Sequence, residues 1–256
     1  MRYEILGPLR IVDGTGNAAT ISAHKVEVLL ATLLIRSDQV VTVDQLISEI
    51  WDRNPPLKVR ASLHVYVSQL RKMLTRPGVP TPIVTLPAGY MLRVGPDSLD
   101  LHDFQRLMCD GRALSREGLY PEAARAYESA LALLRGPVLG DLSEGPIVRG
   151  FVTWLEEARI ECTEMGVEAQ LALGRHRELI GDLYALTAEY PLRESFQRQL
   201  MLALYRAERQ ADALRVYQDV RRVLREELGI EPGRALRRLQ HAILADDDEL
   251  NRQLAG

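Results

Sequence analysis

The sequence predicts a mainly α-helical chain with small β-sheets, divided into two domains. Apolar residues recur at every third or fourth position through most of the 256 residues, which is the periodicity of amphipathic helices. Short alternating segments beside Gly and Pro, which are typical of strands and turns, occur before about residue 99. The length suits two ordinary domains. We therefore predict a mixed domain over residues 1–96 and an all-α domain over residues 97–256.

The first domain is predicted to begin with a small sheet and two helices. Alternating apolar residues on both sides of the Gly-Pro turn at residues 7–8 indicate short strands. Apolar residues at helical spacing predict one helix over residues 26–34 and another over residues 43–51. The second helix follows Thr42, which together with Gln45 forms a capping-box signature.

A third helix, predicted over residues 60–74, combines an apolar stripe with exposed positive charge. Between residues 53 and 96 the chain has seven Lys or Arg and no Asp or Glu, although the net charge of the whole chain is −3. Such a local excess of positive charge favours a polyanionic partner. The apolar side of the helix, expected to face the core, consists of four residues: Leu63, Val67, Leu70 and Leu74.

A β-hairpin is predicted directly after this helix. The segment PIVTLPAGYMLRV contains two short β-like runs around Pro87-Ala88-Gly89. A sheet, three helices and a hairpin in this order are typical of a winged helix-turn-helix domain, in which the third helix enters the major groove of DNA. We therefore interpret residues 1–96 as a winged-helix DNA-binding domain.

The second domain is predicted to consist of helical repeats. Residues 171–186, shifted by 34 positions, align within residues 203–220, and this offset is the tetratricopeptide period and places Gly174 opposite Glu208. A third helix-turn-helix segment, residues 114–133, lies out of phase with these two. We predict a tetratricopeptide-like domain whose stacked helices present a surface to a partner.

Several residues of the third helix are candidates for DNA contacts. Arg71 and Lys72 suit phosphate neutralisation, which strengthens binding without reading sequence. Ser68 and Gln69 suit base edges, and Val65 suits a thymine methyl group. His64 is left open, as a partly exposed filler or a base reader. The candidates on or beside this helix are Lys58, Arg60, Ser62, His64, Val65, Ser68, Gln69, Arg71 and Lys72.

The sequence contains no signature of catalysis, metal binding or membrane insertion. Walker A, G-x-S-x-G, H-E-x-x-H, C-x-x-C and G-x-G-x-x-G patterns are absent, so we expect neither an enzyme nor a cofactor or metal site. Cys109 and Cys162 lie far apart, which favours reduced thiols inside a cell. No apolar stretch approaches membrane-spanning length. The sequence thus predicts a cytoplasmic protein, associated with the nucleoid if it binds DNA.

Several segments, in order, resemble one known family. In chain order, these segments are ILGPLRIVDG, LLATLLIRSDQVVTVDQLISEIWDRNPP, LHVYVSQLRKML, TLPAGYML, ALGRHREL, PLRE, LMLALYRAERQADALRVYQDVR and ELGIEP. They resemble the Streptomyces antibiotic regulatory protein (SARP) family over nearly the whole chain. The resemblance implies an OmpR/PhoB-type winged helix joined to a bacterial transcriptional activation domain of tetratricopeptide-like helices. Family members often have glycine where this chain has Glu208.

The resemblance also implies a function and partners. It predicts a transcriptional activator that binds direct repeats near the promoter −35 element, as a homodimer on DNA, and recruits RNA polymerase to genes for antibiotic or other secondary-metabolite synthesis. The loop Asp52, Arg53 and Asn54 becomes a candidate polymerase contact, although a rigid turn between helices is the favoured explanation of it. The wing lacks the arginine that related domains can carry there, so its DNA contacts are expected from Thr85, from backbone amides or from Arg93.

One alternative function from a different class is compatible with the sequence. The helical repeats could make the chain a protein-interaction scaffold, with a winged domain that no longer binds DNA. This hypothesis predicts weak DNA affinity and no effect of removing the charge of Lys72.

Overall fold

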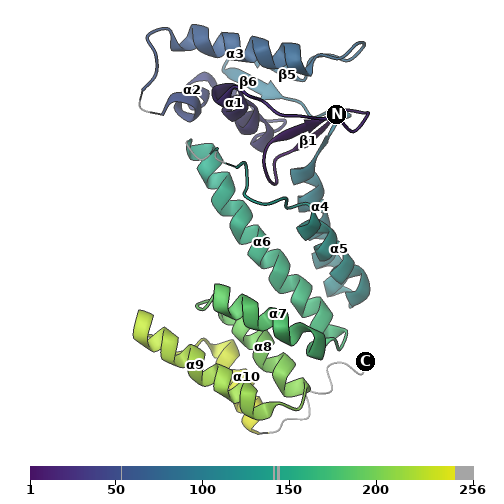
Figure 1. Cartoon of the computed structure of the whole chain (residues 1–256), viewed down its shortest axis with the longest axis vertical. Helices are drawn as coiled ribbons and strands as arrows, with labels where there is room; N and C mark the ends of the chain where they lie inside the picture. Colours follow the sequence, from purple (N-terminus) through teal and green to yellow (C-terminus); the bar gives the residue numbers. More distant parts are fainter. Residues whose placement is uncertain (53, 141, 143–144, 246–256) are drawn as a thin grey trace. The chain divides into compact units, whose positions relative to one another are not determined.

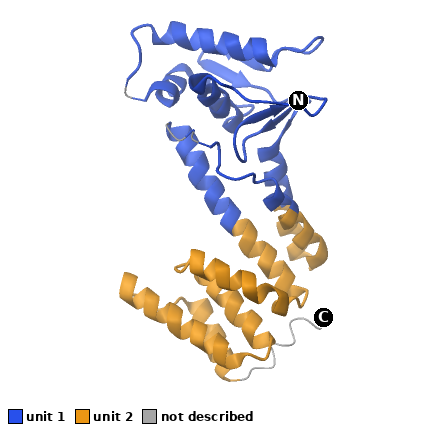
Figure 2. Cartoon of the chain, in the orientation of Figure 1, with its two compact units in different colours: residues 1–107, 129–160 blue, residues 108–128, 161–256 orange. Residues whose placement is uncertain are grey.

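The computed structural model describes residues 1–52, 54–140, 142 and 145–245 (Figure 1). Within these residues the chain forms ten helices and seven short strands, which confirms the predicted mainly α-helical fold with small sheets. The chain divides into two compact units, residues 1–107 with 129–160 and residues 108–128 with 161–256 (Figure 2). The predicted domain boundary after residue 96 stays a prediction.

The first unit opens with a four-stranded sheet that holds the N-terminal segment. Strands β1 and β2 pair antiparallel, with Tyr3 opposite Ile11, and β7 pairs parallel with β1. Strand β7 follows the predicted end of the first domain, and the sequence pattern did not indicate it. In sheet order the strands are β3 (Ala18–Ala19), β2 (Arg10–Val12), β1 (Arg2–Glu4) and β7 (Ser98–Leu99).

The winged-helix elements appear in the predicted order. The helices are α1 (His24–Ile35), α2 (Val43–Trp51) and α3 (Val59–Leu74), and the second sheet has the order β4 (Val41–Thr42), β6 (Gly89–Leu92), β5 (Ile83–Leu86). The predicted capping box is present, because the Thr42 hydroxyl accepts from the Gln45 amide at 3.2 Å and the Gln45 side chain accepts from the Thr42 amide at 2.9 Å. The hairpin turns at residues 87–88, as predicted.

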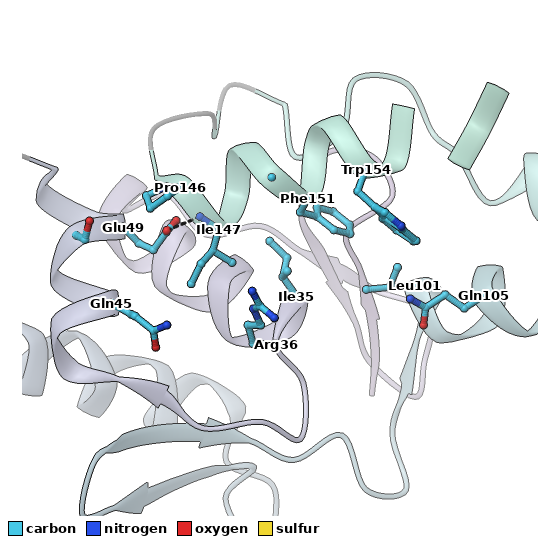
Figure 3. A pocket seen from close by; sticks show the side chains of 12 residues that line it. Ile35, Arg36, Gln45, Glu49, Leu101, Gln105, Pro146, Ile147, Phe151 and Trp154 are labelled. Atoms are coloured by element: carbon cyan, nitrogen blue, oxygen red, sulfur yellow. Dashed lines mark hydrogen bonds between the residues drawn. The ribbon is translucent and has the colours of Figure 1, made fainter. Parts of the chain in front are cut away.

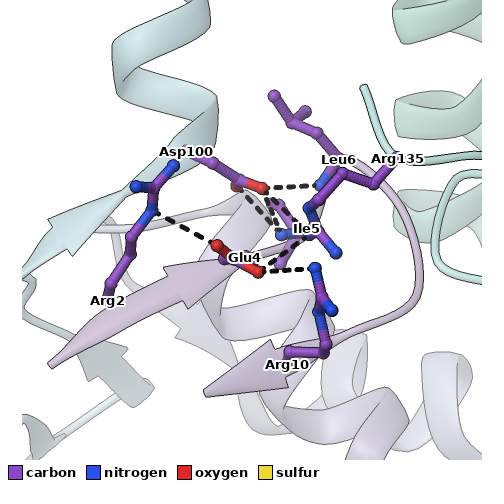
Figure 4. Close-up of polar contacts among 7 residues, drawn as sticks. All are labelled: Arg2, Glu4, Ile5, Leu6, Arg10, Asp100 and Arg135. Carbon is purple, nitrogen blue, oxygen red and sulfur yellow. Dashed lines mark hydrogen bonds and ion pairs between the residues drawn. The ribbon is translucent and has the colours of Figure 1, made fainter. Parts of the chain in front are cut away.

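A buried carboxylate ties the N-terminal strand to the first turn of helix α4 (Asp100–Arg116) (Figure 4). Asp100, which is 1% exposed, accepts hydrogen bonds from the amides of Ile5 and Leu6 at 2.9–3.0 Å. The Arg135 guanidinium lies 3.4 Å from the same carboxylate. Burial raises the pKa of the Asp100 carboxyl, because desolvation outweighs the hydrogen bonds and the charge of Arg135. Asp100 is thus the link between residues far apart in the chain.

The remaining helices confirm the predicted repeat period. They are α5 (Tyr120–Ala132), α6 (Pro146–Ala172), α7 (His176–Glu189), α8 (Glu194–Arg206), α9 (Gln210–Leu228) and α10 (Arg234–Leu244). Helix α8 ends 34 residues after α6 ends, and α9 begins 34 residues after α7 begins. Packing of α7 on α8 and of α8 on α9 buries one apolar cluster in the second unit. The helices therefore stack as neighbouring pairs, as in tetratricopeptide proteins.

The turn within each pair has the same left-handed backbone, whether or not glycine occupies it. Gly174 has φ 77° and its amide donates to the Leu171 carbonyl at 3.1 Å. Glu208 has φ 62° and its amide donates to the Tyr205 carbonyl at 2.9 Å. The glutamate at this position therefore adopts the backbone conformation that glycine adopts most easily.

Glu208→Gly is expected to stabilise the chain. A side chain with a Cβ atom is strained at positive φ, and removing that strain should outweigh the greater flexibility of glycine in the unfolded chain by about 0.5–1 kcal/mol. Urea denaturation would measure the change. Glu208→Ala retains the Cβ atom and serves as the control. Equal stability of the two variants would contradict the strain argument.

The two cysteines have opposite environments within the second unit. Cys162 is fully buried, its thiol donates to the Tyr127 carbonyl at 3.5 Å, and burial raises its pKa to about 12. Cys109 is exposed, and both thiols are free. No helix among the described residues is long and apolar enough to cross a membrane.

Candidate nucleic-acid interface

Helix α3 is anchored by the apolar stripe that the sequence indicates. Its buried residues are Leu63, Val67, Leu70 and Leu74, each at most 2% exposed. They pack against helices α1 and α2. The opposite side of α3 is therefore fixed in orientation and faces away from this core.

The exposed side of α3 presents an adaptable polar surface around one apolar residue. Ser68, Gln69 and Lys72 are exposed, and the side chains of Gln69 and Lys72 bond to no other described residue. Val65, which is 53% exposed, lies at i−3 and i−4 to Ser68 and Gln69 on the same face. Donors, an acceptor, a cation and a methyl-bearing side chain are thus available together, as base and phosphate contacts require.

The N-terminal end of α3 adds positive potential. Lys58 occupies the N-cap position without a side-chain cap, and the first turn contains no acidic residue. The positive end of the helix dipole and the Lys58 charge therefore reinforce each other, which favours a phosphate group. The Arg60 guanidinium lies 3.7 Å from the Asp44 carboxylate, but both side chains are largely exposed. The ion pair is therefore weak, and Arg60 can leave it for another anion. Ser62 is only half-exposed.

Arg71 and Thr85, both predicted to contact DNA, bond to each other. The Arg71 guanidinium donates to the Ile83 carbonyl at 3.0 and 3.1 Å and to the Thr85 hydroxyl at 2.7 Å. Arg71 therefore connects α3 with strand β5 of the wing. Their DNA contacts stay predictions. Arg93, which follows β6, is exposed and its backbone amide donates to the Pro82 carbonyl at 2.8 Å.

Arg71→Ala is expected to lower the free energy of unfolding by about 1–2 kcal/mol, because it removes charged hydrogen bonds to the wing. Chemical denaturation would measure the loss. Lys72→Ala removes a neighbouring charge that bonds to no described residue, and its effect should stay within about 0.5 kcal/mol. Equal losses in both variants would show that Arg71 does not hold the wing.

Two aromatic contacts support α3, and the sequence did not single them out. Tyr66 stacks on Trp51 of α2, with ring centroids 5.7 Å apart, and the ammonium of Lys25 lies 5.3 Å from the Trp51 ring. The position of Tyr66 beside the apolar stripe is the sequence signal that could have indicated this contact. The ring of His64 lies edge-on to Tyr90 of the wing at 6.3 Å. This contact favours the filler interpretation of His64.

The loop before α3 is only partly described. Asp52 is the C-cap residue of α2 with φ 46°, and the Asn54 amide donates to the Trp51 carbonyl at 2.9 Å. Both side chains are exposed. Arg53, the third candidate for a polymerase contact, lies outside the described residues. Leu57, which the sequence analysis passed over, is fully exposed in the same connection.

Comparison with known proteins agrees with this architecture. Residues 99–244 match the family described as bacterial transcriptional activator domain, and residues 18–92 match the family described as transcriptional regulatory protein, C terminal. Regulatory protein DnrI of Streptomyces peucetius is 34% identical over 259 residues, which cover 98% of this chain and 95% of DnrI. The chain belongs to the SARP family. This SARP therefore contains a domain of the transcriptional-regulator type at residues 18–92 and a domain of the bacterial-activator type at residues 99–244.

Two further relatives show how far the likeness extends. EmbR of Mycobacterium tuberculosis is 38% identical over 245 residues, which cover 94% of this SARP and 63% of EmbR, so the chain spans less than two thirds of EmbR. The solved structure of M. tuberculosis EmbR in complex with a low-affinity phosphopeptide superposes with a TM-score of 0.92 at 36% identity. It covers 99% of this SARP and 68% of the EmbR chain.

Proposed function

We propose that this SARP binds double-stranded promoter DNA with α3 in the major groove and activates transcription. The observation that carries the proposal is the exposed side of α3, where Gln69 and Lys72 bond to no described residue while the opposite side is fixed in the core. Lys72 and Arg93 neutralise phosphates, and Ser68 and Gln69 read base edges. Arg71 keeps the wing beside this surface.

The proposal includes the arrangement of protomers on DNA. Two protomers bind direct repeats near the −35 element, head to tail, as a homodimer formed on DNA. Repeats spaced by about one helical turn place both α3 helices on one side of the duplex. Family membership supports this arrangement. The regulated genes form an antibiotic or other secondary-metabolite cluster.

Recruitment of RNA polymerase is the proposed route to activation. The connection between α2 and α3 exposes Asp52, Asn54 and the apolar side chain of Leu57. Leu57 lies between Pro56 and Lys58, so the connection offers an apolar side chain as well as polar ones to a protein partner. We therefore include Leu57 with Asp52, Arg53 and Asn54 as the polymerase-facing loop. The polymerase contact is independent of DNA affinity, so Leu57→Ala should reduce transcription in vitro while leaving DNA binding unchanged.

Fluorescence anisotropy with the full chain tests the DNA-binding proposal. Promoter fragments beside its own gene, and shuffled DNA, are titrated at several salt concentrations. Lys72→Ala should weaken binding to all DNA. It should also reduce the slope of log affinity against log salt concentration by about one, because one phosphate contact is lost. Gln69→Ala should cost about 1–3 kcal/mol on the specific fragment and little on shuffled DNA. The matched controls are two exposed residues of α9, Arg215→Ala and Gln218→Ala, which should change neither affinity.

The outcomes separate the proposal from a scaffold function. If no fragment binds better than shuffled DNA, selection from genomic fragments would find the operator or show that there is none. A selection that enriches no repeat, together with unchanged affinity in Lys72→Ala, would reject DNA reading. The scaffold hypothesis would then explain the helical repeats better.

A further inference from the structure

A pocket in the first unit lies beside the winged-helix core, and none of its lining residues is a candidate for a DNA contact. Its volume is about 710 Å³, which lies within the range of small-molecule sites. Helices α1 and α2 form one side, and α4 and the N-terminal part of α6 form the other (Figure 3). All of its lining residues belong to the first unit.

One end of the pocket is an aromatic wall. Phe151 and Trp154 of α6 stack with ring centroids 5.9 Å apart and planes inclined by 26°. Phe151 is buried, but Trp154 is 42% exposed and lines the pocket together with Leu101. In Figure 3 both rings lie on the same side of the pocket as Leu101. An exposed indole beside apolar side chains offers a stacking surface for a flat ring.

The charges in the pocket are unequally compensated. The Glu49 carboxylate, although 1% exposed, accepts from the amides of Ile147 and Val148 at 2.5 and 3.3 Å, so its charge is satisfied at the N-terminus of α6. The Arg36 guanidinium has no hydrogen bond or ion pair with a described residue. Burial raises the pKa of the Glu49 carboxyl. The charge of Arg36 acts against this shift by Coulombic attraction, without a hydrogen bond to the carboxylate. Among the described residues that line the pocket, Arg36 is thus a cation without a paired anion.

We propose that this pocket binds a planar aromatic molecule that carries one anionic group. The ring stacks on Trp154, the anion pairs with Arg36, and the amide of Gln105 lies beside the aromatic end as a further hydrogen-bonding group. This inference goes beyond the proposed function and does not depend on DNA binding.

The test uses anilinonaphthalene sulfonate, an anion with a planar naphthalene ring, whose fluorescence rises in apolar surroundings. The chain has two tryptophans, so Trp51→Phe leaves Trp154 as the only one. Titration of that variant should quench Trp154 emission with saturation at one site, and the dye emission should rise with the same midpoint. In Trp154→Phe the remaining tryptophan emission comes from Trp51. Its quenching by the dye should be smaller than that of Trp154, and it should not follow the rise in dye emission.

A glycine in the pocket wall permits a sharp blocking variant. Gly150 lies on α6 and lines the pocket, and a Cβ atom at this position would meet nothing within 4 Å. Gly150→Leu should fill the pocket, keep the helix and weaken dye binding by more than about tenfold. Gly181→Leu, at an equally open helical position on α7, is the matched control and should bind the dye as the parent does.

A charge variant tests the anion contact. Arg36→Gln should weaken dye binding by about tenfold, because a charge-assisted pair is lost. Circular dichroism and thermal melting confirm folding of every variant. Dye binding that is unchanged in both Gly150→Leu and Arg36→Gln, or quenching of Trp154 that does not saturate, would overturn the proposal. Binding lost in Gly150→Leu but retained in Arg36→Gln would overturn the anionic part of it.

Discussion

Asp100→Ala is expected to lower the free energy of unfolding by about 3–5 kcal/mol, the range measured when one partner of a buried charged pair is removed. The substitution leaves the amides of Ile5 and Leu6 buried without an acceptor. Among the described residues, it also leaves Arg135 with Glu4, at 3.5 Å, as its remaining anionic partner. Urea denaturation followed by circular dichroism would measure the loss.

Asp103→Ala is the matched control for this prediction. Asp103 lies one turn later in the same helix, is partly exposed and pairs with Arg106 at i+3. Such a surface pair contributes little, so the control should stay within about 0.5 kcal/mol of the parent. A loss below 1 kcal/mol in Asp100→Ala would mean that water replaces the carboxylate at low cost.

Gly89→Ala is the second variant expected to have a large effect, a loss of about 3 kcal/mol. A Cβ atom on Gly89 would lie 2.0 Å from the Val41 carbonyl oxygen and 2.8 Å from the Thr42 Cα. Both are backbone atoms of β4, which pairs with β6 at this position, so the strands must separate to admit the methyl group. The wing would then shift, and DNA affinity should fall with stability.

Gly14→Ala provides the comparison, because a Cβ atom there meets nothing within 4 Å. Denaturation curves and hydrogen exchange of the β4 and β6 amides would be measured for both variants. Full protection of those amides in Gly89→Ala would be incompatible with the predicted separation.

Features that depend on local spacing could be predicted from the sequence. The four apolar residues of α3 are spaced for one helix face, and those four are the buried ones. The Thr42 capping box joins residues three apart, and the 34-residue period recurs in the helix ends. The apolar stripe and the capping box report constraints between near neighbours in the chain, which survive whatever the rest of the chain does.

Features that join distant residues could not be predicted. Asp100 binds amides 94 and 95 residues away, and Glu49 binds amides 98 and 99 residues away. No periodicity marks such partners, because a carboxylate that caps a distant backbone looks like any surface acid. The candidate site shows the same limit. The exposed side of α3 follows from its periodicity, but the bond from Arg71 to the wing depends on how the hairpin folds back.

The unequal environments of the two cysteines provide a practical tool. Cys162 is buried with a strongly raised pKa, so a thiol-reactive dye should modify Cys109 alone in the folded chain. The natural sequence therefore already contains a single attachment point for a fluorophore, and no cysteine has to be introduced or removed. A dye on Cys109, which lies outside the candidate interface, would allow single-molecule counting of protomers in a test of the proposed homodimer on DNA.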